Sequence, residues 1–240
     1  MNIQLKENPI ILHIETATEI CSVALSKGTE LMALKEESKG FSHAEKMIPF
    51  IDQLLREAHI LPSDLDAIAV SIGPGSYTGL RIGASTAKGL CYALNIPAIS
   101  VSTLMSIAEG VKQDKNFNDK DFIIAPMIDA RRMEVYTALY NQNQKLLNDI
   151  HAEIIDESSF KDILELHNVV FCGNGMPKCK ESLSQNKNAL FSAVTLSAQN
   201  MIYPAMEKYK NAQFEDVAYF EPFYLKEYIP GKSTVKGLHN

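Results

Sequence analysis

The chain has 240 residues, 46% of them hydrophobic, which is enough apolar material for one large or two small packed domains. A formal net charge of −6 speaks against a nucleic-acid surface of its own, because phosphate contacts need clustered Lys and Arg. No apolar run reaches the roughly 20 residues that span a bilayer, and the start lacks the features of a signal peptide. With four cysteines and no Cys-x-x-Cys spacing, these features predict a cytoplasmic protein without membrane contact.

The first half of the chain alternates between strand and helix patterns. The elements expected, in chain order, are strands at 10–15, 20–26 and 30–37, a helix at 41–60, a strand at 65–72, a helix at 77–95 and a strand at 96–102. Pro49 lies inside the first helical pattern and should kink that helix or delay its start. Helical spacing resumes at Thr103.

The second half repeats this plan. Apolar strands are expected at 122–129 and 133–140, and an apolar run at 168–175 ends in Gly-x-Gly. Glu15 and Asp129 each end an apolar strand and stand ten residues before the leucine of an Ala-Leu pair. Structural Gly-x-Gly turns follow an apolar strand in each half, at Gly73 and Gly75 and at Gly173 and Gly175. The repetition predicts an α/β protein of two similar lobes, with mixed sheets flanked by helices.

We place the boundary between the lobes near residue 105. The first domain would cover 1–105 and the second 106–240, the latter with a C-terminal helix and a mobile polar tail.

The glycine-rich stretch GPGSYTGLRIG, residues 73–83, stands between a strand and a helix, as phosphate-binding loops do. It fails the P-loop pattern, because no Lys follows at the required position. It also misses the dinucleotide fingerprint, which expects an acid near the end of the next strand, where Ser102 and Thr103 stand. A nicotinamide site is therefore disfavoured.

The same stretch opens a stripe of small residues, spaced four apart on one helix face: Gly79, Gly83, Ala87 and Cys91. Such a stripe lets another element approach the helix closely. Burial against the protein's own sheet and docking against a partner's helix are both open at this point.

Most of the chain resembles the bacterial TsaB (YeaZ) family of tRNA threonylcarbamoyladenosine biosynthesis proteins, within the actin-like ATPase superfamily. The segments that carry the resemblance are ILHIETATEICSVAL, SHAEKMIPFIDQLL, AVSIGPGSYTGLRIGASTAKGL, IPAISVSTL, IDARRMEVYTALY and PFYLKEY. It implies α/β lobes of the actin-like (ASKHA or RNase H-like) kind. It also implies a non-catalytic subunit that supports transfer of a threonylcarbamoyl group to adenosine 37 of ANN-decoding tRNAs.

The resemblance further implies partners. These are a TsaD-type catalytic paralogue in a heterodimer, a TsaE-type ATPase, and tRNA through the complex, with a homodimer when the chain is alone. The residues assigned to docking are Met47, Ile51, Leu55, Gly79, Gly83, Ala87 and Cys91, with Tyr77 and Arg81 at the rim. A Gly83→Leu change is expected to abolish association and to leave the fold largely intact.

No catalysis is expected from this chain alone. The His-x-x-x-His metal motif of the catalytic paralogue falls on Thr103 and Ile107, which are poor metal ligands. The turns that would hold phosphates, at 15–19 and 129–132, lack glycine, and the first carries two acids. Glu15, Thr16, Asp129 and Arg131 are then remnants of a nucleotide site.

Nucleotides, Mg²⁺ and a metal are accordingly expected only on partner subunits. The main rival is an independent actin-like small-molecule phosphotransferase.

Overall fold

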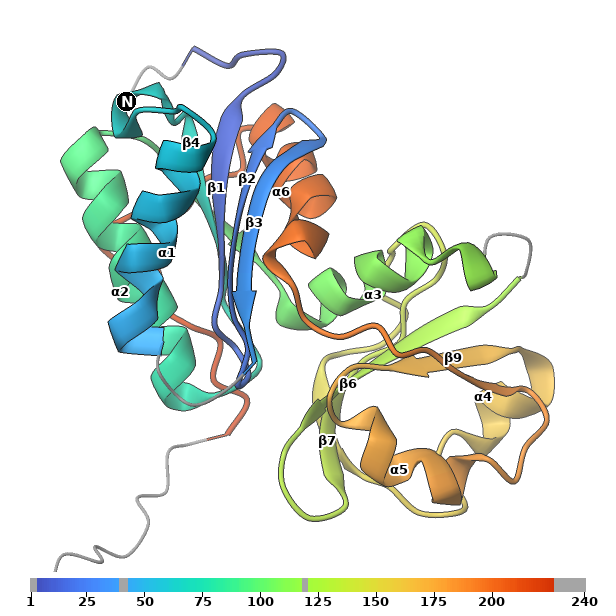
Figure 1. Cartoon of the computed structure of the whole chain (residues 1–240). Helices are drawn as coiled ribbons and strands as arrows, with labels where there is room; N and C mark the ends of the chain where they lie inside the picture. Colours follow the sequence, from blue (N-terminus) through green and yellow to red (C-terminus); the bar gives the residue numbers. More distant parts are fainter. Residues whose placement is uncertain (1–3, 39–42, 118–120, 227–240) are drawn as a thin grey trace, which may run out of the picture.

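The structure, a computed structural model that describes residues 4–38, 43–117 and 121–226, has two lobes, each built on a five-stranded sheet (Figure 1). The strand orders are β3-β2-β1-β4-β5 and β8-β7-β6-β9-β10. In each lobe the first three strands pair antiparallel, and the last two add in parallel beside the first. The shared order confirms the predicted α/β class with two similar lobes and mixed sheets.

The strands are β1 (Ile10–Glu15), β2 (Cys21–Lys27), β3 (Glu30–Glu37), β4 (Ala67–Ser71), β5 (Ala98–Val101), β6 (Ile123–Asp129), β7 (Glu134–Thr137), β8 (His151–Ile154), β9 (Val169–Cys172) and β10 (Ala189–Phe191). The α-helices are α1 (His43–Glu57), α2 (Tyr77–Leu94), α3 (Thr103–Gln113), α4 (Lys161–Leu166), α5 (Met176–Leu183) and α6 (Ile202–Lys210). The 3-10 helices are η1 (Pro62–Asp64), η2 (Lys115–Phe117) and η3 (Ala198–Met201). No described helix is long and apolar enough to cross a membrane.

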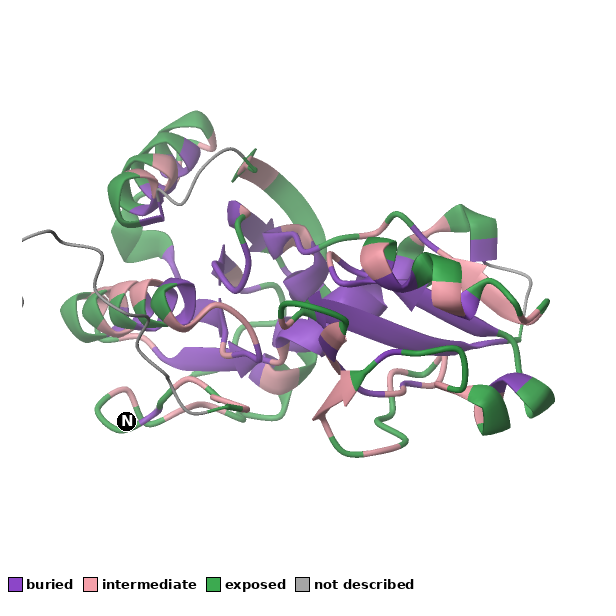
Figure 2. Cartoon of the chain, turned by 90° about the horizontal axis from the view of Figure 1, so that it is seen from below, coloured by how far each residue is buried: buried purple, intermediate pink, exposed green. Residues whose placement is uncertain are grey.

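Strand β1 lies between two helical layers and is buried on both faces. Its Leu12 packs with Met47 of α1 and Ala87 of α2, whereas Ile11 packs with Tyr209 of α6. Figure 1 shows α1 and α2 on one side of β1 and α6 on the other, and Figure 2 shows buried strands between exposed helix surfaces. Burial on both faces explains why this strand reads as an almost continuous apolar run.

The C-terminal helix packs on the first lobe, although the predicted division placed it in the second. Tyr209 of α6 lies in one cluster with residues of β1, β4 and β5, and the backbone N–H of Glu215 donates to Ala98 of β5 at 2.9 Å. The second face of the first sheet needs an apolar cover, and α6 supplies it. Residues 198–223 therefore return to the first lobe, while the predicted tail at 231–240 lies outside the described residues.

The turn after the first strand is built alike in both lobes. Glu15 ends β1 and accepts a hydrogen bond from the backbone N–H of Ala17 at 2.7 Å. Asp129 ends β6 and accepts from the N–H of Arg131 at 2.8 Å. Glu15 is fully buried and also accepts from the Ser71 hydroxyl at 2.8 Å, whereas Asp129 is exposed. The two copies keep one hydrogen bond but differ in environment.

The turn after β1 lies directly against the first turn of α2. The backbone N–H of Ser76 donates to the carbonyl of Ala17 at 2.6 Å. A Cβ atom at Gly79 would lie only 2.1 Å from the carbonyl oxygen of Thr16. Because that distance is far below any tolerable contact, position 79 must be glycine for the two backbones to meet.

Replacing Gly79 by Ala is expected to lower the free energy of unfolding by about 1–3 kcal/mol, the usual cost of overpacking. The matched control is Gly89→Ala in the same helix, where a Cβ would meet no atom within 4 Å. That variant should gain up to about 1 kcal/mol, because Ala is the better helix former. Urea denaturation measures both, and equal effects at the two positions would contradict the close approach at Gly79.

Stability should also depend on pH through Glu15. Burial raises the pKa of this carboxyl from 4.5 to about 7. The stabilisation of the folded state by the neutral carboxyl is therefore full below pH 4.5 and is lost as the pH rises through 7. Glu15→Gln cannot ionise but keeps an oxygen for both hydrogen bonds. The free energy of unfolding of this variant, relative to that of the wild type, should therefore increase by about 3 kcal/mol as the pH rises from acidic values to about 8. Urea titrations across this range check the expectation; a difference that does not change with pH refutes it.

Candidate functional site

A cleft of about 540 Å³ opens between the two lobes. Its wall in the first lobe comes from the turn after β1 and the start of α2, and its wall in the second from the turn after β6. The lining segments are 17–19, 75–78, 128–131 and 224–226, together with Tyr136 and Asn174. The cleft therefore exists only because the two lobes face each other.

The cleft brings together some of the residues that the sequence singled out. Asp129 and Arg131 line it, and so does Tyr77. Glu15 and Thr16 lie behind its wall and are fully buried, with the Thr16 hydroxyl donating to the carbonyl of Gly79 at 2.8 Å. The four residues expected to be remnants of a nucleotide site thus converge, but half of them are out of reach of a ligand.

The two Gly-x-Gly turns occupy equivalent places at the ends of β4 and β9. Gly73 and Gly173 have φ angles of 113° and 89°, where residues with a side chain are strained. A Cβ at Gly75 would lie 2.4 Å from the carbonyl of Ala17, and one at Gly175 would lie 3.0 Å from the backbone nitrogen of Asp129. Each turn therefore lies against the strand-end turn of its own lobe.

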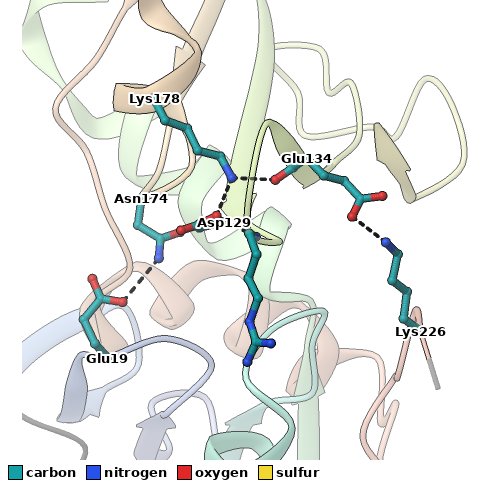
Figure 3. Close-up of polar contacts among 7 residues, drawn as sticks. Glu19, Asp129, Glu134, Asn174, Lys178 and Lys226 are labelled. Carbon is teal, nitrogen blue, oxygen red and sulfur yellow. Dashed lines mark hydrogen bonds and ion pairs between the residues drawn. The ribbon is translucent and has the colours of Figure 1, made fainter. Parts of the chain in front are cut away.

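Two polar contacts cross the mouth of the cleft (Figure 3). The side-chain amide of Asn174 in the second lobe donates to Glu19 of the first at 3.3 Å. Lys226, which follows the segment 198–223 that packs on the first lobe, forms an ion pair with Glu134 at the start of β7. These contacts join the lobes on the solvent side of the cleft.

Other charges of the cleft are largely paired as well. Lys178 forms an ion pair with Asp129 and donates to the carbonyl of Glu134 at 2.7 Å. Within the described parts of the chain, the Arg131 side chain has no ion-pair partner. One guanidinium therefore remains for an anionic group that approaches the cleft.

Tyr77 and Arg81, expected at the rim of a partner interface, contact Tyr224 of the same chain. The rings of Tyr77 and Tyr224 lie 4.6 Å apart, and the Arg81 guanidinium lies 4.2 Å above the Tyr77 ring. Arg81 Nε also donates to the Tyr224 hydroxyl at 3.2 Å. Sequence reasoning missed Tyr224 and Lys226 as cleft residues, because nothing in the sequence reveals that residues 218–224 run along α2.

The turns that correspond to phosphate-binding turns have two of their N–H groups occupied by the chain itself. A phosphate held by these turns needs their backbone N–H groups, but Glu15 and Asp129 already accept from Ala17 and Arg131. A second carboxylate in the first turn, Glu19, would repel the anion.

The two positions set against the His-x-x-x-His motif lie inside a helix. Thr103 and Ile107 are fully buried in α3. Across residues 4–38, 43–117 and 121–226, no group of three or more His, Cys, Asp or Glu side chains could hold a metal ion.

The structure corrects the residues assigned to a docking surface. All of the following are buried inside the first lobe: Met47, Ile51, Leu55, Gly79, Gly83, Ala87 and Cys91. Both helices turn their apolar stripes toward their own sheet. Of the two alternatives left open for the small stripe, the structure shows burial inside the protein and not docking against a partner's helix. A Cβ at Gly83 would lie 2.4 Å from the Thr16 hydroxyl, so Gly83→Leu would disturb the fold itself.

The outward face of the same helices carries other residues. Ile48 of α1 is 55% exposed, and Tyr92 of α2 is 85% exposed. Gly89 lies on this face of α2 with open space beside it.

Comparison with known proteins gives consistent matches. The family model described as TsaD, tRNA N6-adenosine threonylcarbamoyltransferase, matches residues 37–227. The tRNA threonylcarbamoyladenosine biosynthesis protein TsaB of Escherichia coli (strain K12) is 30% identical over 228 residues, which are 92% of this chain and 96% of that protein. The protein of the same name from Buchnera aphidicola subsp. Acyrthosiphon pisum is 38% identical over 135 residues, covering 56% of this chain but only 59% of the relative.

Solved structures agree with these relatives. YeaZ from Pseudomonas aeruginosa has a TM-score of 0.78 and 26% identity, over 90% of this chain and 100% of that one. An inorganic polyphosphate/ATP-glucomannokinase from Arthrobacter shares the fold, with a TM-score of 0.53 and 11% identity over 85% of this chain and 100% of that one. The chain has the two-lobed fold of the actin-like ATPases, and it belongs to the TsaB (YeaZ) family of tRNA threonylcarbamoyladenosine biosynthesis proteins.

Proposed function

We propose that this chain is a non-catalytic subunit of the cytoplasmic complex that transfers a threonylcarbamoyl group to adenosine 37 of ANN-decoding tRNAs. The observation that carries the proposal is the match to TsaB of E. coli, which extends over 96% of that protein. Its name assigns that relative to the biosynthesis of threonylcarbamoyladenosine in tRNA.

Catalysis is assigned to a TsaD-type paralogue, with which this chain forms a heterodimer. Two features support this division. In the two strand-end turns, the N–H groups of Ala17 and Arg131 are already bonded to carboxylates of the same turn. Helix α3 carries Thr103 and Ile107 where the paralogue has histidines. ATP, Mg²⁺ and a metal then belong to the paralogue and to a TsaE-type ATPase, and tRNA binds through the complex. An independent phosphotransferase would need free phosphate loops.

The outward face of α1 and α2 is the docking surface in this proposal. It combines the exposed apolar side chains of Ile48 and Tyr92 with the open surface at Gly89. A helix of the paralogue can approach closely at Gly89 and cover Tyr92, which lies one turn further along α2. The same face would hold a second copy of this chain when the paralogue is absent.

Depletion of this protein is expected to reduce threonylcarbamoyladenosine strongly in bulk tRNA, because the complex would lose an essential subunit. Mass spectrometry of nucleosides from digested tRNA measures the modified base. Re-expression of the chain should restore it. An undiminished level after confirmed depletion would sink the assignment.

Gly89→Arg is expected to weaken the heterodimer about tenfold or more, a change of at least about 1.4 kcal/mol in binding free energy. A long charged side chain would separate the two helices, whereas its Cβ would meet no atom of its own chain within 4 Å. The matched control is Leu166→Arg in α4, a residue that is 77% exposed in the second lobe. Calorimetric titration with the purified paralogue compares them. If Gly89→Arg binds like wild type, the docking surface lies elsewhere, and the proposed pathway still stands.

A further inference from the structure

Two residues that line the cleft, Ala17 and Ile128, belong to an apolar cluster shared by both lobes, which we call the apolar floor. Leu80 of α2 and Ala17 of the turn after β1 come from the first lobe and are fully or almost fully buried. They lie in one cluster with Ile107 of α3 and Ile128 of β6, whose other members come mainly from the second lobe. The core of the second lobe therefore continues into the first without a polar break.

The polar contacts at the mouth are of a different kind. Lys226 and Glu134 keep 47% and 22% of their side-chain surface exposed, and Asn174 meets Glu19 on the same open side. Ion pairs in water contribute little to stability, whereas a buried leucine contributes much more. The apolar floor is accordingly the stronger tie.

A ligand is poorly placed to control this geometry. In proteins that close around a phosphate ligand, the ligand joins the two lobes and differs in affinity for their open and closed states. Here the N–H groups of Ala17 and Arg131 are bonded within their own turns, to Glu15 and Asp129. In each turn, one N–H group that could face a phosphate is therefore already bonded within the chain.

We propose that the chain itself holds its two lobes at a fixed angle, with Leu80 of the apolar floor as the main tie, and that no nucleotide opens or closes the cleft. An extensive apolar interface is the condition under which two lobes stop moving relative to each other. This inference does not depend on the proposed docking surface.

Spin labels on the two lobes test the proposal. Cysteines replace Leu61 beside η1 and Leu166 in α4, which are 65% and 77% exposed. The native cysteines do not interfere, because all four are buried, and burial raises the pKa of the Cys21 thiol to about 11. Pulsed electron resonance measures the distance distribution between the labels, without and with ATP and Mg²⁺.

One narrow distribution, unchanged by ATP and Mg²⁺, is the expected result for the otherwise wild-type chain. Two separate distances, or a shift when ATP and Mg²⁺ are added, would overturn the proposal. This measurement is decisive on its own, even if a core variant fails to fold.

Two variants then identify the main tie. Asn174→Ala combined with Lys226→Ala removes both mouth contacts and should leave the distribution unchanged. Leu80→Ala, with its fold checked by circular dichroism, should broaden it or add a longer distance. The opposite pattern, with opening in the double variant and none in Leu80→Ala, would overturn the assignment to the apolar floor.

Discussion

The backbone of Thr16 and Ala17 lies against the first turn of α2, with the carbonyl of Ala17 accepting from Ser76 at 2.6 Å. This contact is possible only because a glycine at position 79 lets Thr16 approach. It buries the end of β1 and with it the Glu15 carboxyl, whose pKa rises for that reason. It also brings α2 to the cleft, so that Leu80 reaches the core of the second lobe.

The second lobe repeats this turn without repeating its burial. Asp129 keeps the bond to the N–H two residues on, but it is exposed and pairs with Lys178. Two copies of one motif have therefore diverged through their surroundings: one is part of the core, and the other forms a polar wall of the cleft. Two residues after Asp129, Arg131 has a φ of 71° and lines the cleft. The equivalent position of the first copy, two residues after Glu15, is Ala17.

Local patterns predict the elements up to β7 well, since long apolar runs and glycine turns mark their limits. Strands β8 and β10 escape sequence reasoning because HAEI and ALF are short and carry no period. Placing α6 on the first sheet requires knowing which sheet face is uncovered, and helical spacing cannot show that. The Lys226–Glu134 contact joins residues 92 positions apart, so no local pattern could predict it.

Helix α2 shows why its small residues could be read in two ways. An i, i+4 stripe identifies a face that another element approaches, but not which element. In α2 that inner face carries Gly79 and Gly83 and is occupied by the turn after β1. Gly89 lies off this stripe, and a Cβ there would meet no atom within 4 Å, so no close contact in the described structure requires glycine at this position. Because an exposed helical glycine costs stability relative to alanine, Gly89 is the position where α2 departs from what folding alone favours.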